Sequence, residues 1–334
     1  MQDLDSFIRR LPKAELHLHL EGSVQPETLQ ELALSKGRLE KETRGWITDR
    51  IEQRYRFKDF QDFLQAFKLV TMLLETPDDY ALATTRLIEW LASQNVRYAE
   101  IIFAAGVVLW KAQPLEAIFE GAASAARAAE EISGVRVQWV FDAIRHFGAE
   151  HTREVLRWAG RFRSHGVVAL GIGGDEARGP AELFREVFRE AREMGLHVVA
   201  HAGEACGPES VRQAVEALGA ERIGHGLTAA RDPAVLALLH DRRIALEVCL
   251  TSNVATGVLG RIEDHPLPQF LDAGLAVTLN SDDPAMFGTD LVNEYLLAAR
   301  TFQLTREQIL QMAQNAVRAA FLPEKEKLYL LSQF

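Results

Sequence analysis

Residues 15–21 read Glu-Leu-His-Leu-His-Leu-Glu, so that leucines alternate with charged or imidazole side chains. A period of two is typical of a β-strand, because successive side chains of a strand point to opposite faces. We expect the leucine face to be buried, which puts His17 and His19 together on the other face, with their Cα atoms about 6.6 Å apart. Two imidazoles at that spacing can bind one metal ion at about 2.0–2.1 Å. A His-x-His pattern by itself could also belong to a strand whose polar face is exposed to solvent and binds no metal.

The rest of the chain alternates short apolar runs with longer amphipathic stretches, which is the order expected of βα units. Strands are predicted over residues 14–20, 97–103, 135–142, 167–172, 197–202, 222–225, 244–250 and 275–280. Glycines such as Gly195 and Gly274 precede the next strand, where a helix would end. This order predicts an α/β fold, a (β/α)8 TIM barrel, as one domain over residues 1–334, with helices in Thr305–Phe334 closing it.

A helical insertion is expected after the first strand, because the interval before the second strand is too long for one helix and a turn. We assign residues 40–80 to it as a helical lid within the barrel domain. Phe60, Phe63, Leu64 and Phe67 follow one another at helical spacing. The simplest interpretation is that they pack a helix onto the barrel, and the alternative is an apolar lid over the mouth of a pocket.

Composition narrows the class of protein. The 334 residues include 37 Lys and Arg against 47 Asp and Glu, a net charge of −10, without a basic cluster. This argues against nucleic-acid and membrane partners. No apolar stretch reaches the roughly 20 residues that span a bilayer, and the first residues lack the pattern of a signal peptide, so a cytoplasmic protein is expected. Cys206 and Cys249 make a disulfide framework improbable.

Polar residues follow several other predicted strands at their carboxyl ends, which is where barrel enzymes place their active sites. His201 ends the fifth strand with Glu204 close behind, and His225 ends the sixth between two glycines. The eighth strand runs into Asp282 and Asp283. Taken singly, each has a structural explanation. Glu204 could be an acid at a helix N-terminus, His225 a hydrogen-bonded core histidine, and Asp282-Asp283 a turn followed by a helix cap.

Considered jointly, they indicate a site of three histidines and an aspartate: His17, His19, His201 and Asp282. Zinc is the first choice for these ligand types, and manganese, iron and cobalt remain compatible with them. His197 begins the fifth strand at the opposite end of the barrel and is expected to be structural.

Other motifs are missing. Gly171 and Gly173 match the first two glycines of a dinucleotide-binding fingerprint, but Glu176 stands where the third glycine is needed. No phosphate-binding P-loop is present. The Pro-Cys-x-x-Cys signature of cytidine-type deaminases is absent as well.

In order and spacing, the motifs resemble those of the adenosine deaminase family of the amidohydrolase superfamily over essentially the whole chain. The matching stretches are Leu-His17-Leu-His19-Leu-Glu21-Gly-Ser, Gly174-Asp175-Glu176, His201-Ala-Gly-Glu204, Gly224-His225-Gly226, Glu247-Val-Cys-Leu-Thr-Ser252-Asn253 and Ser281-Asp282-Asp283-Pro284. The resemblance implies hydrolytic deamination, in purine nucleotide metabolism, of the 6-amino group of adenosine or a related nucleoside, giving an inosine-type product and ammonia.

The resemblance also implies one zinc ion per chain, bound by the four predicted ligands. Glu204 would protonate the purine ring nitrogen N1, and His225 would orient or deprotonate the attacking water. Asp283 would hydrogen-bond ring nitrogen N7, and the backbone of Gly174 would meet N3.

Three departures from the family pattern leave the substrate open. Glu21 stands where the family uses an aspartate for the ribose 5′-hydroxyl, residues 100–105 lack the usual Arg and Ser-Pro, and Gly171 replaces the usual aspartate ahead of Gly174-Asp175-Glu176. Glu21 would repel a 5′-phosphate, which favours nucleosides over nucleotides. The alternatives are 6-aminodeoxyfutalosine, in menaquinone biosynthesis, and adenine.

Two rival functions are weaker. A barrel hydrolase of esters or amides with two metals commonly uses a bridging lysine after the fourth strand, where this chain has Gly173 and Gly174. A purine-binding module without catalysis would not be expected to keep every ligand and Glu204. The expected partner is a small-molecule substrate, and the sequence is compatible with a monomer or a homodimer.

Overall fold

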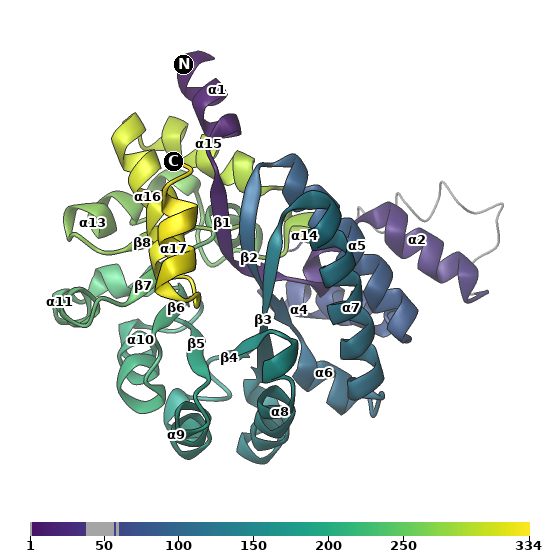
Figure 1. The fold of residues 1–334 in the computed structure, drawn as a ribbon. Helices are drawn as coiled ribbons and strands as arrows, with labels where there is room; N and C mark the ends of the chain where they lie inside the picture. Colours follow the sequence, from purple (N-terminus) through teal and green to yellow (C-terminus); the bar gives the residue numbers. More distant parts are fainter. Residues whose placement is uncertain (1, 38–56, 58–59) are drawn as a thin grey trace.

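Eight parallel strands form one sheet in sequence order, wrapped into a barrel with helices around it (Figure 1). The computed structural model describes residues 2–37, 57 and 60–334. The strands are β1 (Lys13–His19), β2 (Val96–Phe103), β3 (Arg136–Ile144), β4 (Val167–Gly173), β5 (His197–Ala202), β6 (Arg222–His225), β7 (Ala245–Val248) and β8 (Val277–Leu279). Beyond the end of β8, a bridge between Leu18 and Asp282 joins the last strand region to the first.

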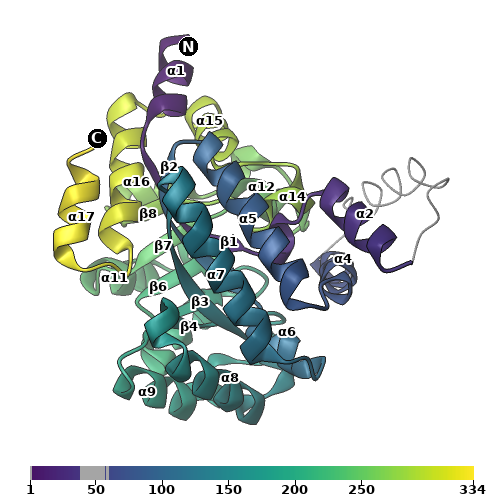
Figure 2. The ribbon, with the colours of Figure 1, turned by 45° about the vertical axis from the view of Figure 1, so that its right-hand side comes forward.

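The helices cover the outside of the barrel, as the two views together show (Figures 1 and 2). They are α1 (Gln2–Arg10), α2 (Pro26–Ser35), α4 (Phe60–Leu73), α5 (Pro77–Ser93), α6 (Ala105–Trp110), α7 (Leu115–Ser133), α8 (Ala149–Arg161), α9 (Arg185–Glu193), α10 (Pro208–Gln213), α11 (Pro233–Asp241), α12 (Leu250–Ala255), α13 (Leu267–Asp272), α14 (Pro284–Phe287), α15 (Leu291–Thr301), α16 (Arg306–Ala319) and α17 (Glu324–Leu331). Helix α16 packs against β1 and β8, where the barrel closes.

The predicted fold is confirmed. All eight predicted strands are present, each within two residues of its predicted ends. Gly195 and Gly274 have φ angles of 75° and 69°, the left-handed conformation in which glycine ends a helix. Cys206 and Cys249 are both free thiols. In the described part of the chain, no helix has both the length and the apolar character needed to cross a membrane.

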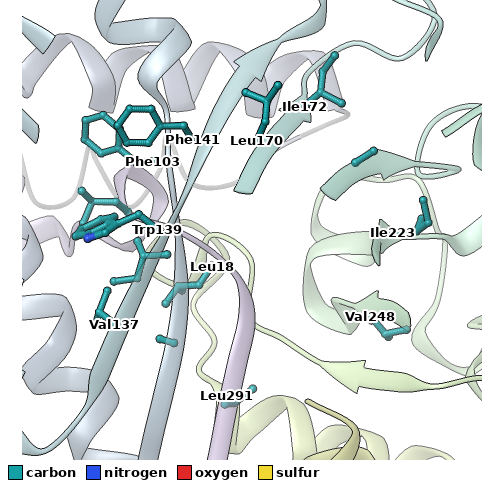
Figure 3. Close-up of a cluster of buried hydrophobic side chains, with 14 of the residues drawn as sticks. Leu18, Phe103, Val137, Trp139, Phe141, Leu170, Ile172, Ile223, Val248 and Leu291 are labelled. Atoms are coloured by element: carbon teal, nitrogen blue, oxygen red, sulfur yellow. The ribbon is translucent and has the colours of Figure 1, made fainter. Parts of the chain in front are cut away.

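Alternation along the strands divides the apolar side chains between two cores. Phe103, Trp139 and Phe141 point outward into the layer between strands and helices (Figure 3). The residues next to them in sequence point inward, and Ile102, Val140, Ala169 and Val199 form an apolar cluster inside the barrel. The inward positions beyond this cluster, toward the carboxyl ends of the strands, are those that can serve a site.

Charged side chains also lie in the barrel interior, and they balance one another. Arg222 is 1% exposed, and its guanidinium lies 2.5 Å from a carboxylate oxygen of Glu100 and 2.5 Å from one of Glu247. Buried ions are tolerated only when they are paired, because leaving water is costly for each of them. The other carboxylate oxygen of Glu247 lies 2.9 Å from Nδ1 of His17, so this chain of charges reaches the predicted metal site.

The predicted insertion is described only in part, because residues 38–56 and 58–59 lie outside the described residues. Within α4, Phe63 lies in an apolar cluster with Met286, and its ring centre is 5.2 Å from that of Phe287. Packing of this helix onto the barrel is therefore observed. The assignment of residues 40–80 as a lid stays a prediction.

Candidate metal centre

The four predicted ligands converge from parts of the chain that are far apart in sequence. His17 and His19 come from β1, His201 from β5, and Asp282 from the loop after β8. One ligand atom from each of the four lies within 4.8 Å of the others, and all four residues are buried. Parallel strands in a barrel bring their carboxyl ends to one rim, which is why these residues meet.

The separations between the ligand atoms fit a single ion. Nε2 of His19 lies 3.2 Å from Nε2 of His201, and Oδ1 of Asp282 lies 3.3 Å from Nε2 of His17 and 3.4 Å from Nε2 of His19. Two ligands about 2.0–2.1 Å from one tetrahedral zinc ion stand about 3.3 Å apart. Nε2 of His17 is moreover buried without a hydrogen-bond partner among the described residues, which is how a ligand nitrogen aimed at an ion would look.

The ionisation of His19, His201 and Asp282 suits metal binding. Burial lowers the pKa of His17, but its hydrogen bonds with Asp282 and Glu247 outweigh burial and raise this pKa to about 10, so His17 must release a proton when a cation binds. Burial lowers the pKa of His19 to about 3 and holds that of His201 well below its usual value, so both imidazoles are neutral at pH 7. Burial opposes ionisation of Asp282, but the nearby His17 imidazole holds the pKa of this carboxyl well below its ordinary range. Neutral imidazole and ionised carboxylate are the forms that bind metals.

Further side chains orient the ligands from behind. Oε2 of Glu247 lies 2.9 Å from Nδ1 of His17, so the Nε2 atom is left to face the centre. The hydroxyl of Ser252 donates a hydrogen bond of 2.6 Å to Oδ2 of Asp282. Such contacts fix the ring orientation and the basicity of metal ligands. They leave Oδ1 of Asp282 as the oxygen that faces the imidazoles.

The backbone around the centre is shaped for close approach. A Cβ atom at Gly224 would lie 2.5 Å from Cε1 of His17, so no other residue fits beside that imidazole. His225 and Asp282 have φ angles of 62° and 63°, which non-glycine residues seldom adopt. Strain of this kind gathers at functional sites, where the surrounding structure holds it in place.

Glu204 stands beside the centre without being one of the four ligands. It is 7% exposed, and its Oε2 lies 3.7 Å from Nε2 of His225. Burial, together with the charges of Asp282 and Glu176, raises the pKa of Glu204 well above its usual value. This shift favours the protonated form of Glu204.

The turn that carries Glu204 is held by Glu176. The carboxylate of Glu176 accepts hydrogen bonds of 2.8 Å from the backbone N–H of Gly203, 3.0 Å from that of Glu204 and 2.8 Å from that of Ala205. These hydrogen bonds explain the role of Glu176 in the Gly-Asp-Glu motif. It fixes the position of Glu204 relative to His201 at the end of β5.

A cavity of about 270 Å³ opens onto the centre. It is lined by most of the predicted site residues: His19, Gly174, His201, Glu204, His225, Asp282 and Asp283. Aromatic side chains of α4 and the stacked rings of Trp110 and Phe147, with centres 5.7 Å apart, form its outer walls. Trp110 is 49% exposed, so the cavity runs from the buried centre to the surface.

Glu21 is placed differently from the other predicted residues. It is fully buried and is not among the residues that line the cavity. One of its carboxylate oxygens accepts a hydrogen bond of 3.2 Å from the backbone N–H of Ala104, and burial raises its pKa to about 7. A direct contact between Glu21 and a substrate stays a prediction.

Several residues at the centre and around the cavity were not predicted from the sequence. Asp142 lines the cavity at the end of β3, where an acid closing a barrel strand was a usable signal. Ser252 and Asn253 were noted only as part of a motif, and Asn253 donates a hydrogen bond of 3.2 Å to Nδ1 of His225. Glu247 contacts Nδ1 of His17, which lies on another strand. The sequence of β7 alone does not indicate that contact.

Comparison with known proteins gives matches along almost the whole chain. The family described as adenosine deaminase matches residues 12–334. An aminodeoxyfutalosine deaminase of Streptomyces avermitilis is 40% identical over 334 residues, which cover 99% of this chain and 92% of that protein.

Solved structures agree with the fold. The crystal structure of adenine deaminase from Arthrobacter aurescens superposes with a TM-score of 0.91 at 31% identity and covers 96% of this chain and 97% of that chain. An amidohydrolase of Burkholderia ambifaria, described with bound Zn, has a TM-score of 0.88 at 25% identity and covers 98% of this chain and 90% of that chain.

We expect that His201→Ala removes most of the metal from the purified protein, because one of four ligands is lost. His197→Ala is the matched control: His197 lies on the same strand, is partly exposed and pairs with Glu221 at 3.0 Å, away from the centre. Elemental analysis of both variants measures the metal content. Full occupancy in His201→Ala, or equal loss in both variants, would contradict the assignment.

Proposed function

The chain belongs to the adenosine deaminase family, and from that membership we propose that it is a zinc-dependent hydrolase that removes the 6-amino group of a purine nucleoside and releases ammonia. The observation that carries the proposal is the cluster of His17, His19, His201 and Asp282, whose ligand atoms have the separations of a one-zinc site. Glu204 lies next to that cluster, at the inner end of a cavity open to the surface.

Zinc is the metal proposed because three imidazoles and one carboxylate suit it, and because a structural neighbour is described with bound Zn. Zinc bound by such ligands supplies Lewis-acid activation of a water molecule at neutral pH. The remaining parts of the reaction are the tasks of the protein side chains.

Glu204 is proposed to donate its proton to N1 of the purine. Attack of water at C6 breaks the conjugation of the ring, so the electrons displaced onto N1 must be met by a proton as the new C6–O bond forms. The reaction is completed when the amino group takes up the proton released by the attacking water, the C6–N bond breaks and ammonia leaves, and the C6 hydroxyl returns a proton to Glu204. A positioned acid of this kind accelerates a reaction by about 10²–10⁴-fold.

His225 is proposed to orient the attacking water by donating a hydrogen bond to it from Nε2. The side-chain amide of Asn253 donates to Nδ1 of His225, so the neutral ring carries its proton on Nε2. That atom faces Oε2 of Glu204 at 3.7 Å and Oδ2 of Asp282 at 4.0 Å. A water held between these groups would lie within reach of an imidazole that burial keeps neutral, because burial lowers its pKa to about 4.

Asp283 and Gly174 are proposed to hold the purine ring. Ring nitrogen N7 is an acceptor, so Asp283 must donate to it. Burial and the adjacent Asp282 raise the pKa of Asp283 well above its usual value, which favours the protonated form. Oδ1 of Asp283 is buried without a partner in the described residues, so it is available to a ligand. The backbone of Gly174 lines the same cavity and is assigned to N3.

For the substrate, we propose 6-aminodeoxyfutalosine first and adenosine second. The first follows the 40% identity to an aminodeoxyfutalosine deaminase, which extends over 99% of this chain. The second follows the family description and the Gly174-Asp175-Glu176 motif. The cavity continues from the centre to Trp110 at the surface, which favours a purine with a substituent over free adenine.

We expect ammonia release from 6-aminodeoxyfutalosine to have the highest kcat/KM in a panel that also contains adenosine, 2′-deoxyadenosine, adenine and adenosine 5′-monophosphate. The monophosphate should be the poorest nucleoside-type substrate, because the enclosed acid Glu21 repels a second negative charge. A coupled assay for ammonia measures all five. Preference for adenine would contradict the substrate assignment, and inactivity on all five would contradict the deaminase assignment.

Glu204→Gln should keep its zinc and lose roughly 10²–10⁴ in kcat, because an amide has no proton to give to N1. Glu209→Gln is the matched control, since Glu209 lies in the first turn of α10, is exposed, and contacts Arg212 and Gln213 at 3.3 Å each. Steady-state kinetics and zinc analysis on both variants decide the matter. Wild-type turnover in Glu204→Gln would remove Glu204 from the mechanism.

A further inference from the structure

Asp142 is a buried acid in the site for which the reaction described above has no task. It lies near the carboxyl end of β3, is 3% exposed and lines the cavity together with His201 and Gly173. Its Oδ1 is enclosed and makes no hydrogen bond within the described ranges of the chain. Enclosing a carboxyl oxygen without a partner is unfavourable for folding, so the fold alone does not explain why an acid stands here.

Two glycines on β4 provide the space for this carboxyl group. Asp142 pairs in register with Gly171, and a Cβ atom at Gly171 would lie 2.9 Å from Oδ1 of Asp142. A Cβ atom at Gly173 would lie 3.0 Å from Oδ2 of Asp142 and 3.3 Å from Nδ1 of His201. The carboxyl of Asp142 thus occupies the volume that side chains on β4 would otherwise fill.

Position 171 is also one where, by the resemblance described for the sequence, the family usually has an aspartate and this chain has glycine. An acid at position 171 would point into the same volume from the neighbouring strand, because the two positions are directly paired. The carboxyl of Asp142 on β3 thus stands where a side chain at position 171 on β4 would stand.

We propose that Asp142 is a substrate-facing residue of the deamination site, and that it supplies from β3 the acid group that the family pattern supplies from position 171 on β4. The inference rests on the proposed function, since it assigns a further residue to the same cavity. The ligand group that it meets is a hydrogen-bonding one, a hydroxyl or a ring nitrogen of the nucleoside.

The surroundings of Asp142 favour a neutral acid. Burial raises its pKa to about 8, against the opposing effects of His17 and Arg145. A protonated carboxyl both donates and accepts a hydrogen bond, so it can serve either kind of ligand group. It also avoids repulsion from Glu21, whose charge raises the pKa of Asp142 as well.

The first test separates a functional role from a structural one. Asp142→Ala should lower kcat/KM for the best substrate by about tenfold or more, the loss expected for one hydrogen bond. Its unfolding temperature and zinc content should equal those of the wild type. Glu294→Ala is the control: Glu294 is a buried acid that accepts hydrogen bonds of 2.9 Å from the Leu250 N–H and 2.8 Å from the Thr289 hydroxyl, so its loss should lower the unfolding temperature. Wild-type kcat/KM in Asp142→Ala, or a fall in unfolding temperature like that of Glu294→Ala, overturns the proposal.

The second test moves the acid back to β4. A Cβ atom at Gly171 would also lie 2.9 Å from Cγ1 of Val140, so the exchange is made in a Val140→Ala background. Adding Gly171→Asp to the Val140→Ala/Asp142→Ala protein should raise kcat/KM by about threefold or more, as coupling between contacting positions allows. If kcat/KM does not rise in a folded protein with full zinc content, the claim that Asp142 replaces an acid at position 171 is wrong.

These tests are distinguishable from a failure of the proposed function. If the wild type releases no ammonia from any 6-aminopurine in the panel, the deaminase assignment fails and the role of Asp142 fails with it. If the wild type is active and the variants behave as the contrary outcomes state, only the inference about Asp142 fails.

Discussion

The crowding of three imidazoles and one carboxylate in a buried space is the constraint on which the rest of this structure depends. The ligand atoms of His19, His201 and Asp282 stand 3.2–3.4 Å from a neighbour in the group, and all are shielded from water. A cation shared by these groups would pair with all of them at once. The barrel supplies what this arrangement requires: strands that end at one rim, a glycine where His17 needs room, and acids behind the ligands.

The barrel interior is organised in relation to that site. An apolar layer that includes Ile102 and Val199 fills the middle of the barrel. A chain of alternating charges also runs through the interior, from Glu100 through Arg222 and Glu247 to His17, with contacts of 2.5, 2.5 and 2.9 Å. Because each charge is paired, the chain can be buried, and it ends on a ligand of the proposed metal. The interior charges therefore serve both the fold and the site, because Glu247 pairs with Arg222 and also orients His17.

Much of this could be predicted from the amino-acid sequence, because the deciding signals are local. The alternation around His17 and His19, the apolar runs and the residues that close them depend on neighbours in sequence. The strands were therefore predicted correctly, and the four predicted ligands lie together in the structure. Asp142 closes a predicted strand, which is a local signal, but the space for its carboxyl depends on Gly171, which lies opposite it on another strand. The enclosure of Glu21 likewise depends on the backbone of Ala104 at the end of β2. Register between strands is set by the whole barrel, and no single stretch of sequence reveals it.

Membership of the adenosine deaminase family accounts for hydrolytic deamination, and the choice of substrate depends on the walls of the cavity. The claim beneath all of this is that one zinc ion sits between the four ligands. Anomalous X-ray scattering recorded on both sides of the zinc absorption edge, from crystals grown without chelators, tests it most directly. The account predicts one peak about 2.0–2.2 Å from Nε2 of His17, His19 and His201 and from Oδ1 of Asp282. A peak elsewhere, or none at this position, would contradict it.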